Sequence, residues 1–481
     1  MQNSFINQLK TNPVTPWIVI FVFLAIFSRT GGGTNEYSRY ATLRAMSDQQ
    51  TFKINDYVSW TIDWAQTPDG SYYSNKAPGP MFLAFPAFYL LEQITKFDIK
   101  EKFETKIDPV SGKSRTIRPN LPGPTTRTLI ALITQLIPYA VLCFLLGNFL
   151  LQQGVPIWGV HFMAVALLFG NTASLFANIF FGHALTACLL LFSHFFLLQK
   201  KYFWVGLFFG LALLSDYTVT LLGPLVLINL IFANRREFRW MGKLLAGGLL
   251  PGILWCWYHI STCGSPFVIP AHFQNPIWQN MKHESHNLWG LFVLQIRWDL
   301  IGELIFGSMR GILFTQPWVL CLIPMQFFLY KKILQDKIMM STSILCLIGL
   351  AFLLIMNSSF GGWHGGHTSG PRYLSMVFPI FALMAALFYG HLPKWCQGLL
   401  WISLMPSLVL RALVYGSTPL AHEQPIWPYL YNFMIAQEAG KGMLRFGLLL
   451  SGLILVALVV WLQRNKRLAH QSQDFINGKA L

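Results

Sequence analysis

Apolar runs long enough to cross a lipid bilayer recur along almost the whole chain, from Pro16 to Leu462. A helix needs about 20 predominantly apolar residues to cross the hydrocarbon core, and in lipid only helices and closed barrels satisfy every backbone polar group. Of the 481 residues, 54% are hydrophobic and only 11% are charged, which is typical of polytopic membrane proteins. We therefore expect an all-α polytopic membrane protein with a single domain, 1–481.

Short basic loops set the expected orientation, because Lys and Arg are enriched in cytoplasmic loops. This use of the basic residues also accounts for the formal charge of +16, so a nucleic-acid partner is not expected. Counting between the loops gives twelve crossings with both termini on the cytoplasmic side. The basic loops are Lys200–Lys201, Arg235–Lys243, Lys331–Lys332 and Arg464–Arg467, and the expected crossings are 14–29, 127–150, 157–178, 182–199, 203–216, 218–234, 243–262, 311–330, 338–357, 373–391, 396–416 and 443–463.

The apolar segment 79–95 does not cross in this scheme, because a crossing there would move every later basic loop to the outer side. We expect an interfacial or re-entrant helix instead. The long basic segment 96–127 then lies outside, which is tolerable because long loops obey the charge rule least. The expected external segments are 30–126, 263–310 and 358–372.

Most of the unusual polar residues then share the outer face of the membrane. A carboxylate near the membrane and partly desolvated could take a proton from an acceptor hydroxyl. Each of these carboxylates could instead be a solvated loop residue or a helix cap. The candidates are Glu36 beside Asn35, then Asp56, Asp63, Asp69 and Asp216.

Three cations lie among aromatic residues and glycines beside expected crossings, namely Arg39, Lys76 and Arg372. A phosphate ester at the membrane edge needs such counter-charges, with Arg giving bidentate contacts and Lys a point charge. Tyr73 and Tyr373 flank two of these cations and join the candidate donor-binding set. The alternative is that the basic side chains extend to lipid headgroups.

Residues 361–373, GGWHGGHTSGPRY, form the most glycine-dense stretch. Glycines let backbone amides approach a pyrophosphate or a sugar closely. His364 and His367 could bind that ligand or a divalent metal, but no third metal ligand is evident. His183, at the start of a crossing, could contact the ligand or satisfy a backbone carbonyl.

Six strings in order along nearly the whole chain resemble the GT-C membrane glycosyltransferases. This superfamily includes the protein O-mannosyltransferases and the lipid A aminoarabinose transferases, and the likeness is greatest to their uncharacterised bacterial relatives. Each string is weak alone, and the six in order carry the resemblance. The strings are NEYSRYATLRAM, INDYVSWTIDWAQ…DGSYYSNKAPG, FFGHALTACLL, CGSPF, SMRGILFTQPW and WHGGHTSGPRYL.

The resemblance implies a GT-C fold with juxtamembrane helices in the first external loop. It also implies transfer of a sugar from a polyprenyl-phosphate donor to an acceptor hydroxyl on a lipid, a glycan or a protein. The expected location is the bacterial inner membrane, with the active site facing the periplasm or the exterior. In the aminoarabinose transferases a lysine–proline pair contacts the donor phosphate, and Lys76 with Pro78 matches it.

The chain departs from that pattern at Asn35–Glu36, where the characterised families carry an Asp-Glu pair whose Asp is the presumed base. An amide is not a useful proton acceptor, so we expect Asp63 to be the base, with Glu36 as second choice. His183 stands where those families place a second acidic residue.

Single displacement with one base would invert the anomeric centre. The donor carries its own phosphate leaving group, so no cofactor is required, and dependence on a divalent metal is left open. Two other functions remain in view, namely a non-enzymatic lipid-linked sugar translocase or scaffold, and a hydrolase that takes water as acceptor.

Cysteine labelling tests the orientation. In a cysteine-free background, cysteines introduced at Lys106 and His367 should react with an impermeant maleimide added outside, whereas cysteines at Arg236 and Lys332 should not. Labelling of position 106 only from the cytoplasmic side would mean that 79–95 crosses.

Overall fold

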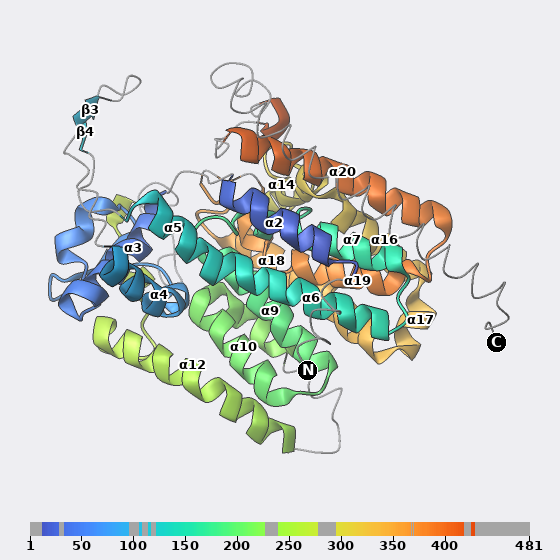
Figure 1. Cartoon of the computed structure of the whole chain (residues 1–481), viewed down its shortest axis with the longest axis horizontal. Helices are drawn as coiled ribbons and strands as arrows, with labels where there is room; N and C mark the ends of the chain where they lie inside the picture. Colours follow the sequence, from blue (N-terminus) through green and yellow to red (C-terminus); the bar gives the residue numbers. More distant parts are fainter. Residues whose placement is uncertain are drawn as a thin grey trace.

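Helices make up nearly all of the regular structure (Figure 1). The structure is a computed structural model that describes residues 12–27, 33–95, 105–107, 114–116, 122–226, 239–277, 295–366, 368, 370–417 and 425–428.

The first half of the chain contains α2 (Thr15–Phe27), α3 (Thr34–Gln49), α4 (Gly79–Thr95), α5 (Pro124–Ala131), α6 (Ile137–Gln152), α7 (Ile157–Leu168), α8 (Thr172–Leu175), α9 (Gly182–Leu198) and α10 (Tyr202–Ser215). The second half contains α12 (Arg239–Cys263), α14 (Trp298–Phe306), α15 (Ile312–Thr315), α16 (Pro317–Phe328), α17 (Tyr330–Gln335), α18 (Lys337–Ser359), α19 (Phe378–Tyr389) and α20 (Lys394–Ser417). Shorter turns are η1 (Asn55–Trp60), the π-helical η2 (Leu132–Leu136), η3 (Tyr217–Leu222), η4 (Pro270–Phe273) and η5 (Arg372–Leu374).

Helix α19 lies at the centre of the bundle, and every one of its residues is buried. It packs on α7, which is buried over most of its length, and on α9. A helix that is apolar on all sides belongs in the core of a large protein or in a membrane. The outer helices expose large apolar side chains, including Leu245, Leu249 and Ile402, as expected for surfaces that face lipid.

Helices α10 and α12 run side by side along one edge of the bundle (Figure 1). Glycines permit this close approach: a Cβ on Gly206 would collide with the Leu244 carbonyl, and a Cβ on Gly247 would collide with the Phe203 carbonyl. Small residues at helix contacts are the usual route to tight packing in membranes.

Helices α3 and α4 lie together at one end of the bundle (Figure 1). Between them in sequence, β1 (Trp64–Gln66) pairs antiparallel with β2 (Tyr72–Ser74), with Trp64 opposite Ser74. A second small hairpin joins β3 (Thr105–Ile107) to β4 (Ser114–Thr116). This end of the bundle therefore carries the first expected external loop.

Each expected crossing that the structure describes is helical over at least part of its length; 218–234 is described only to residue 226, and 443–463 lies outside the described part of the chain. Residues 227–238 and 429–481 lie outside that part. By length and composition, three described helices can cross a membrane, namely 125–152, 239–263 and 337–359, and shorter apolar helices account for most of the others.

Two expected crossings are interrupted rather than continuous. Residues 157–178 divide into α7 and α8, because Asn171 bonds the carbonyls of Ala166 and Leu167 and caps α8 by accepting from the Ser174 N–H. Residues 311–330 divide into α15 and α16 before Pro317, whose ring favours a helix start. Short-range periodicity does not reveal such breaks.

The α10–α12 contact can be tested with two glycines of the same helix. Gly247→Ala should lower the thermal midpoint in detergent, because overpacking against backbone typically costs about 1–3 kcal/mol. Gly252→Ala is the matched control, since a Cβ there has no atom within 4 Å. Equal midpoints for the two variants would contradict the close contact.

Candidate functional site

Hydroxyl groups on α3 hold Asp63 in place. Thr34 Oγ1 donates to Asp63 Oδ2 at 2.9 Å, and Ser38 Oγ donates to the Asp63 carbonyl oxygen at 2.6 Å. Thr34 and Ser38 are four residues apart, so they lie on one face of the helix. Asp63 is only 6% exposed. Both the backbone and the carboxylate of Asp63 are thereby fixed at the first turns of α3.

The β1–β2 hairpin brings Lys76 back to Asp63. Ser74 Oγ lies 2.7 Å from Ser38 Oγ and accepts the Lys76 backbone N–H at 3.2 Å. Lys76 Nζ lies 3.3 Å from Asp63 Oδ1. Burial lowers the pKa of Lys76, and the Asp63 carboxylate opposes that shift. Lys76, the first residue of the segment KAPGP (76–80), is thus held in an ion pair with Asp63.

A tight turn closes this hairpin. Gly70 has a φ of 81°, a region that glycine enters without strain. Asp69 accepts hydrogen bonds from Thr67 and from both the hydroxyl and the N–H of Ser71. These hydrogen bonds, with that from the Thr67 hydroxyl the strongest, lower the pKa of Asp69 to about 2. Asp69 is therefore a turn residue rather than part of the site.

Arg39 is buried near several carboxylates. Its Nη1 donates to the Asn35 side-chain oxygen and, at 3.1 Å, to the Asn35 carbonyl oxygen. Burial lowers the pKa of Arg39 to about 10, and the charges of Asp216 and Asp63 oppose that shift. Asn35 therefore orients a guanidinium, because its amide oxygen accepts a hydrogen bond without adding a charge.

Two glycines bring three helices together at this point. A Cβ on Gly79, the first residue of α4, would collide with the Ser215 hydroxyl at the end of α10. A Cβ on Gly182, the first residue of α9, would lie 2.8 Å from the Ser215 carbonyl oxygen and 3.1 Å from Arg39 Nη2. The starts of α4 and α9 and the end of α10 can meet only because neither position carries a side chain.

His183 and Asp216 form a hydrogen-bonded pair beside this contact. His183 Nδ1 lies 2.9 Å from Asp216 Oδ2. Asp216 Oδ1 accepts from the Thr218 N–H at 3.1 Å and from the Thr218 hydroxyl at 2.7 Å. Asp216 is therefore the N-cap of η3 as well as the partner of an imidazole.

Arg372 reaches the same place from the glycine-rich loop. Its Nη2 donates to the Tyr373 hydroxyl at 2.8 Å, and its guanidinium lies 4.8 Å from the centroid of that ring. The Tyr373 ring stands edge-on to His183, with centroids 5.7 Å apart. Gly365, with a φ of 72°, leaves room for the Arg372 side chain.

The residues brought together are named here the charged cluster: Glu36, Arg39, Asp63, Lys76, His183, Asp216 and Arg372. Arg39 interacts electrostatically with four of them, and Lys76 with Arg39 and Arg372. Glu36 is buried and accepts from the Phe180 N–H at 3.4 Å. The convergence expected from sequence is thus present, with Asn35 and Tyr373 at its margin.

Other candidates lie elsewhere. Asp56 is exposed and accepts from Gln49 Nε2 at 2.6 Å. Tyr73 is buried in a separate aromatic group with Phe52 and Tyr258. His364 Nδ1 accepts the Gly366 N–H at 3.1 Å, and His367 lies outside the described residues. Within the described part, three or more His, Cys, Asp or Glu side chains nowhere gather as metal ligands.

The sequence did not point to several residues that support the charged cluster. Thr34 and Thr218 donate to the carboxylates of Asp63 and Asp216, and Ser38 donates to the Asp63 backbone carbonyl. Tyr217 Oη lies 3.1 Å from His259 Nε2. The spacing of Thr34 and Ser38 on one helix face was an available signal. The Tyr217–His259 contact joins residues 42 positions apart, for which sequence offered none.

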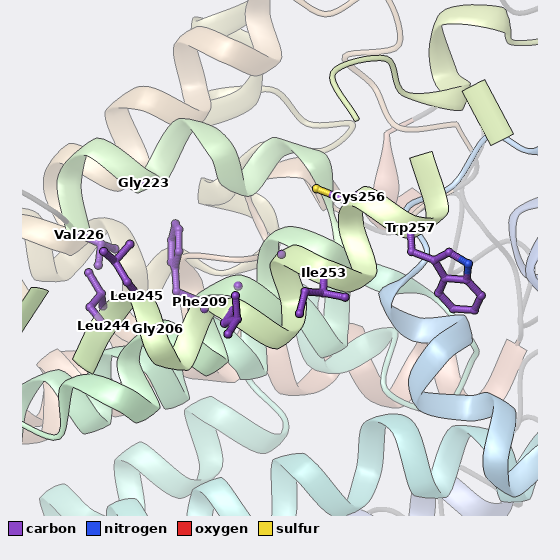
Figure 2. A pocket seen from close by; sticks show the side chains of 13 residues that line it. Gly206, Phe209, Gly223, Val226, Leu244, Leu245, Ile253, Cys256 and Trp257 are labelled. Atoms are coloured by element: carbon purple, nitrogen blue, oxygen red, sulfur yellow. The ribbon is translucent and has the colours of Figure 1, made fainter. Parts of the chain in front are cut away.

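An apolar groove of about 870 Å³ lies apart from the charged cluster, between α10 and α12 (Figure 2). Its walls include Phe209, Leu245 and Ile253. Trp257, at one end, stacks on Phe82 of α4 with ring centroids 5.6 Å apart. The groove has no polar side chain suited to chemistry.

No protein-family model matches the chain, and no curated protein matches it. The chain is similar in structure to ArnT from Cupriavidus metallidurans bound to undecaprenyl phosphate, with a TM-score of 0.51 and 13% identity over 97% of this chain and 73% of that chain. ArnT of the same organism in the apo state aligns with a TM-score of 0.47 and 13% identity, over 95% of this chain and 76% of that chain. The first similarity confirms the expected fold, a polytopic membrane protein of the GT-C type.

The charged cluster should be unusually sensitive to loss of Arg39. Arg39→Met removes a buried positive charge that interacts electrostatically with Asp216, Asp63 and Glu36, together with the hydrogen bonds to Asn35. Leaving buried polar groups without a partner costs about 1–3 kcal/mol each. The thermal midpoint in detergent should fall clearly. Arg297→Met is the control, because its pair with Asp299 at 3.0 Å is exposed and contributes little. If both substitutions lower the thermal midpoint equally, the charge of Arg39 contributes no more to stability than that of Arg297.

Proposed function

We propose that this protein is a glycosyltransferase that moves a sugar from a polyprenyl-phosphate donor to an acceptor hydroxyl, with inversion at the anomeric carbon. The observation that carries the proposal is the convergence of Lys76, Arg39 and Arg372 at one end of an apolar helical bundle. Three buried or half-buried cations in one place at a bundle end suit an anionic headgroup whose tail stays in lipid.

The likeness to a structure solved with undecaprenyl phosphate supports the donor class. The donor's phosphate is the leaving group, so its oxygens gain negative charge as the bond to the sugar breaks. Lys76 supplies a point charge, and Arg39 and Arg372 supply planar guanidiniums that can bind two oxygens each. Preorganised charges of this kind stabilise the transition state without reorganising at the moment of reaction.

The proposed location is the bacterial inner membrane, with the charged cluster on the periplasmic side. The same end of the bundle holds α3, α4 and the β1–β2 hairpin, which belong to the first expected external loop. A lipid, a glycan or a protein hydroxyl could reach a site at that end. The acceptor would approach from water while the donor tail remains in the bilayer.

The Asp63 carboxylate is the base that the sequence predicts, and Glu36 is the second choice. In the ligand-free structure both oxygens of Asp63 are engaged, one by Lys76 and one by Thr34. Each oxygen still has a second lone pair, so Asp63 can accept a proton while these contacts persist.

Donor binding can be tested directly on the purified protein. Mass spectrometry of co-purified lipid should find a polyprenyl phosphate or its sugar conjugate. Lys76→Ala should weaken binding of undecaprenyl phosphate by about tenfold to a hundredfold, as expected for loss of one hydrogen bond between charged groups.

Lys53→Ala is the matched control, because Lys53 forms an exposed pair with Asp69 at 3.7 Å in the same hairpin region. If Lys76→Ala binds undecaprenyl phosphate with unchanged affinity, Lys76 contacts the headgroups of the surrounding bilayer lipids and not the donor phosphate. Binding of the lipid without any sugar transfer would favour a translocase or a scaffold.

A further inference from the structure

The His183–Asp216 pair has the geometry of an oriented base. Ionised Asp216 can only accept hydrogen bonds, so the proton between the two side chains belongs to His183 Nδ1. The tautomer of the ring is thereby set. The lone pair of the neutral ring lies on Nε2, at the opposite side of the imidazole.

The Asp216 carboxylate is itself held rigidly. Its second oxygen receives two hydrogen bonds from Thr218, one from the N–H and one from the hydroxyl. Because Asp216 also ends α10 and caps η3, its position depends on two elements of the bundle. His183 is the second residue of α9, so the pair joins three elements at fixed distances.

His183 Nε2 remains available. Among the described residues it has no hydrogen-bond partner, and the side chain is 12% exposed. The rings of Phe176, Phe181 and Tyr373 surround the imidazole, with centroid distances of 6.0, 6.5 and 5.7 Å. These aromatic rings limit the access of water to the imidazole.

Asp63 differs in this respect. Each of its carboxylate oxygens already has one partner, Lys76 for one and Thr34 for the other, whereas His183 Nε2 has no hydrogen-bond partner among the described residues. A general base must be within hydrogen-bond reach of the proton that it removes. His183 Nε2 can receive such a proton without giving up a hydrogen bond to any described residue.

We propose that His183 is the proton acceptor in sugar transfer and that Asp216 is its positioning residue, while Asp63 serves to position Lys76. This inference rests on the proposed function. The acceptor oxygen attacks the anomeric carbon, and the bond from that carbon to the phosphate oxygen breaks with its electron pair. The hydroxyl proton passes to His183 Nε2. The products are the glycosylated acceptor, polyprenyl phosphate and an imidazolium that later releases its proton to water.

The charges in the charged cluster favour His183 as the proton acceptor and Asp63 as the residue that positions Lys76. Three cations, Arg39, Lys76 and Arg372, face three carboxylates, Glu36, Asp63 and Asp216, so the formal sum with neutral His183 is zero. A bound phosphate makes the cluster negative. A proton taken up by His183 then restores part of the balance, and Asp216 stabilises the imidazolium.

The first test is chemical rescue of the full-length protein in membranes supplied with lipid-linked sugars extracted from the producing cells. His183→Ala should lower turnover by about 10²-fold or more, and added imidazole should restore part of it. Binding of undecaprenyl phosphate should stay within about threefold of the wild-type affinity, which shows that the variant is folded. Normal turnover in His183→Ala would overturn the proposal.

Asp216→Asn tests the positioning role while keeping the cap, because Asn is as good an N-cap as Asp. Its amide can present N–H to the ring and so favour the wrong tautomer. The value of kcat should fall while KM for the lipid donor stays unchanged. The matched control is Asp336→Asn, another N-cap, which accepts from the N–H groups of Ile338 and Met339 and is hydrogen-bonded to no imidazole among the described residues.

Asp63→Asn separates the two candidate bases. If Asp63 positions Lys76, this variant should raise KM for the donor more than it lowers kcat. Loss of kcat in Asp63→Asn together with normal turnover in His183→Ala would assign the base to Asp63 and overturn the proposal. That result would leave the proposed glycosyltransferase function unchanged. If the wild-type protein neither binds undecaprenyl phosphate nor forms polyprenyl phosphate as a product, the proposed function itself is contradicted.

A second measurement needs no acceptor. Diethyl pyrocarbonate acylates a neutral imidazole at an accessible nitrogen, and peptide mass spectrometry locates the product. His183 should be modified in the wild-type protein, protected by undecaprenyl phosphate, and modified more slowly in Asp216→Asn than in Asp336→Asn. An unreactive His183 would show that Nε2 is not available and would overturn the proposal.

Discussion

The contact at Ser215 is the constraint on which the site depends. Gly79 and Gly182 both approach this residue so closely that a Cβ on either would clash. The start of α4, the start of α9 and the end of α10 therefore meet at one point. Lys76 precedes α4, His183 is the second residue of α9 and Asp216 follows α10, so one steric requirement brings these three side chains together.

Electrostatics explains why the cluster lies at the bundle end rather than in its middle. Charged groups inside the hydrocarbon region are costly unless they are paired. Burial lowers the pKa of Arg39 and of Lys76, and the neighbouring carboxylates oppose both shifts. The positive and negative charges of the cluster balance before a ligand binds. The cluster can therefore bind an anionic lipid headgroup although it carries no large excess of positive charge in the free protein.

Asn35 illustrates how a departure from a family pattern can be misread. From the sequence, Asn35 is a departure from the Asp-Glu pair of the similar families, and the base is expected at Asp63 instead. In the structure the Asn35 oxygen accepts from Arg39, so the side chain orients a cation and no proton transfer is asked of it. The His183–Asp216 pair, formed by residues 33 positions apart, supplies a proton acceptor that no single motif displays.

The sequence by itself determined the membrane class, the helix positions and the identity of most cluster residues, because hydrophobic length and local glycine and proline content are properties of short segments. That local information did not show that Tyr73 and Asp56 lie apart from the charged cluster. It also did not show that two expected crossings break at Asn171 and Pro317. Only the tertiary structure decided that Lys76 pairs with Asp63, that Asp216 orients His183 and that Asp56 stands apart. These contacts depend on how closely helix ends approach one another, and that distance is set by packing between segments far apart in the chain.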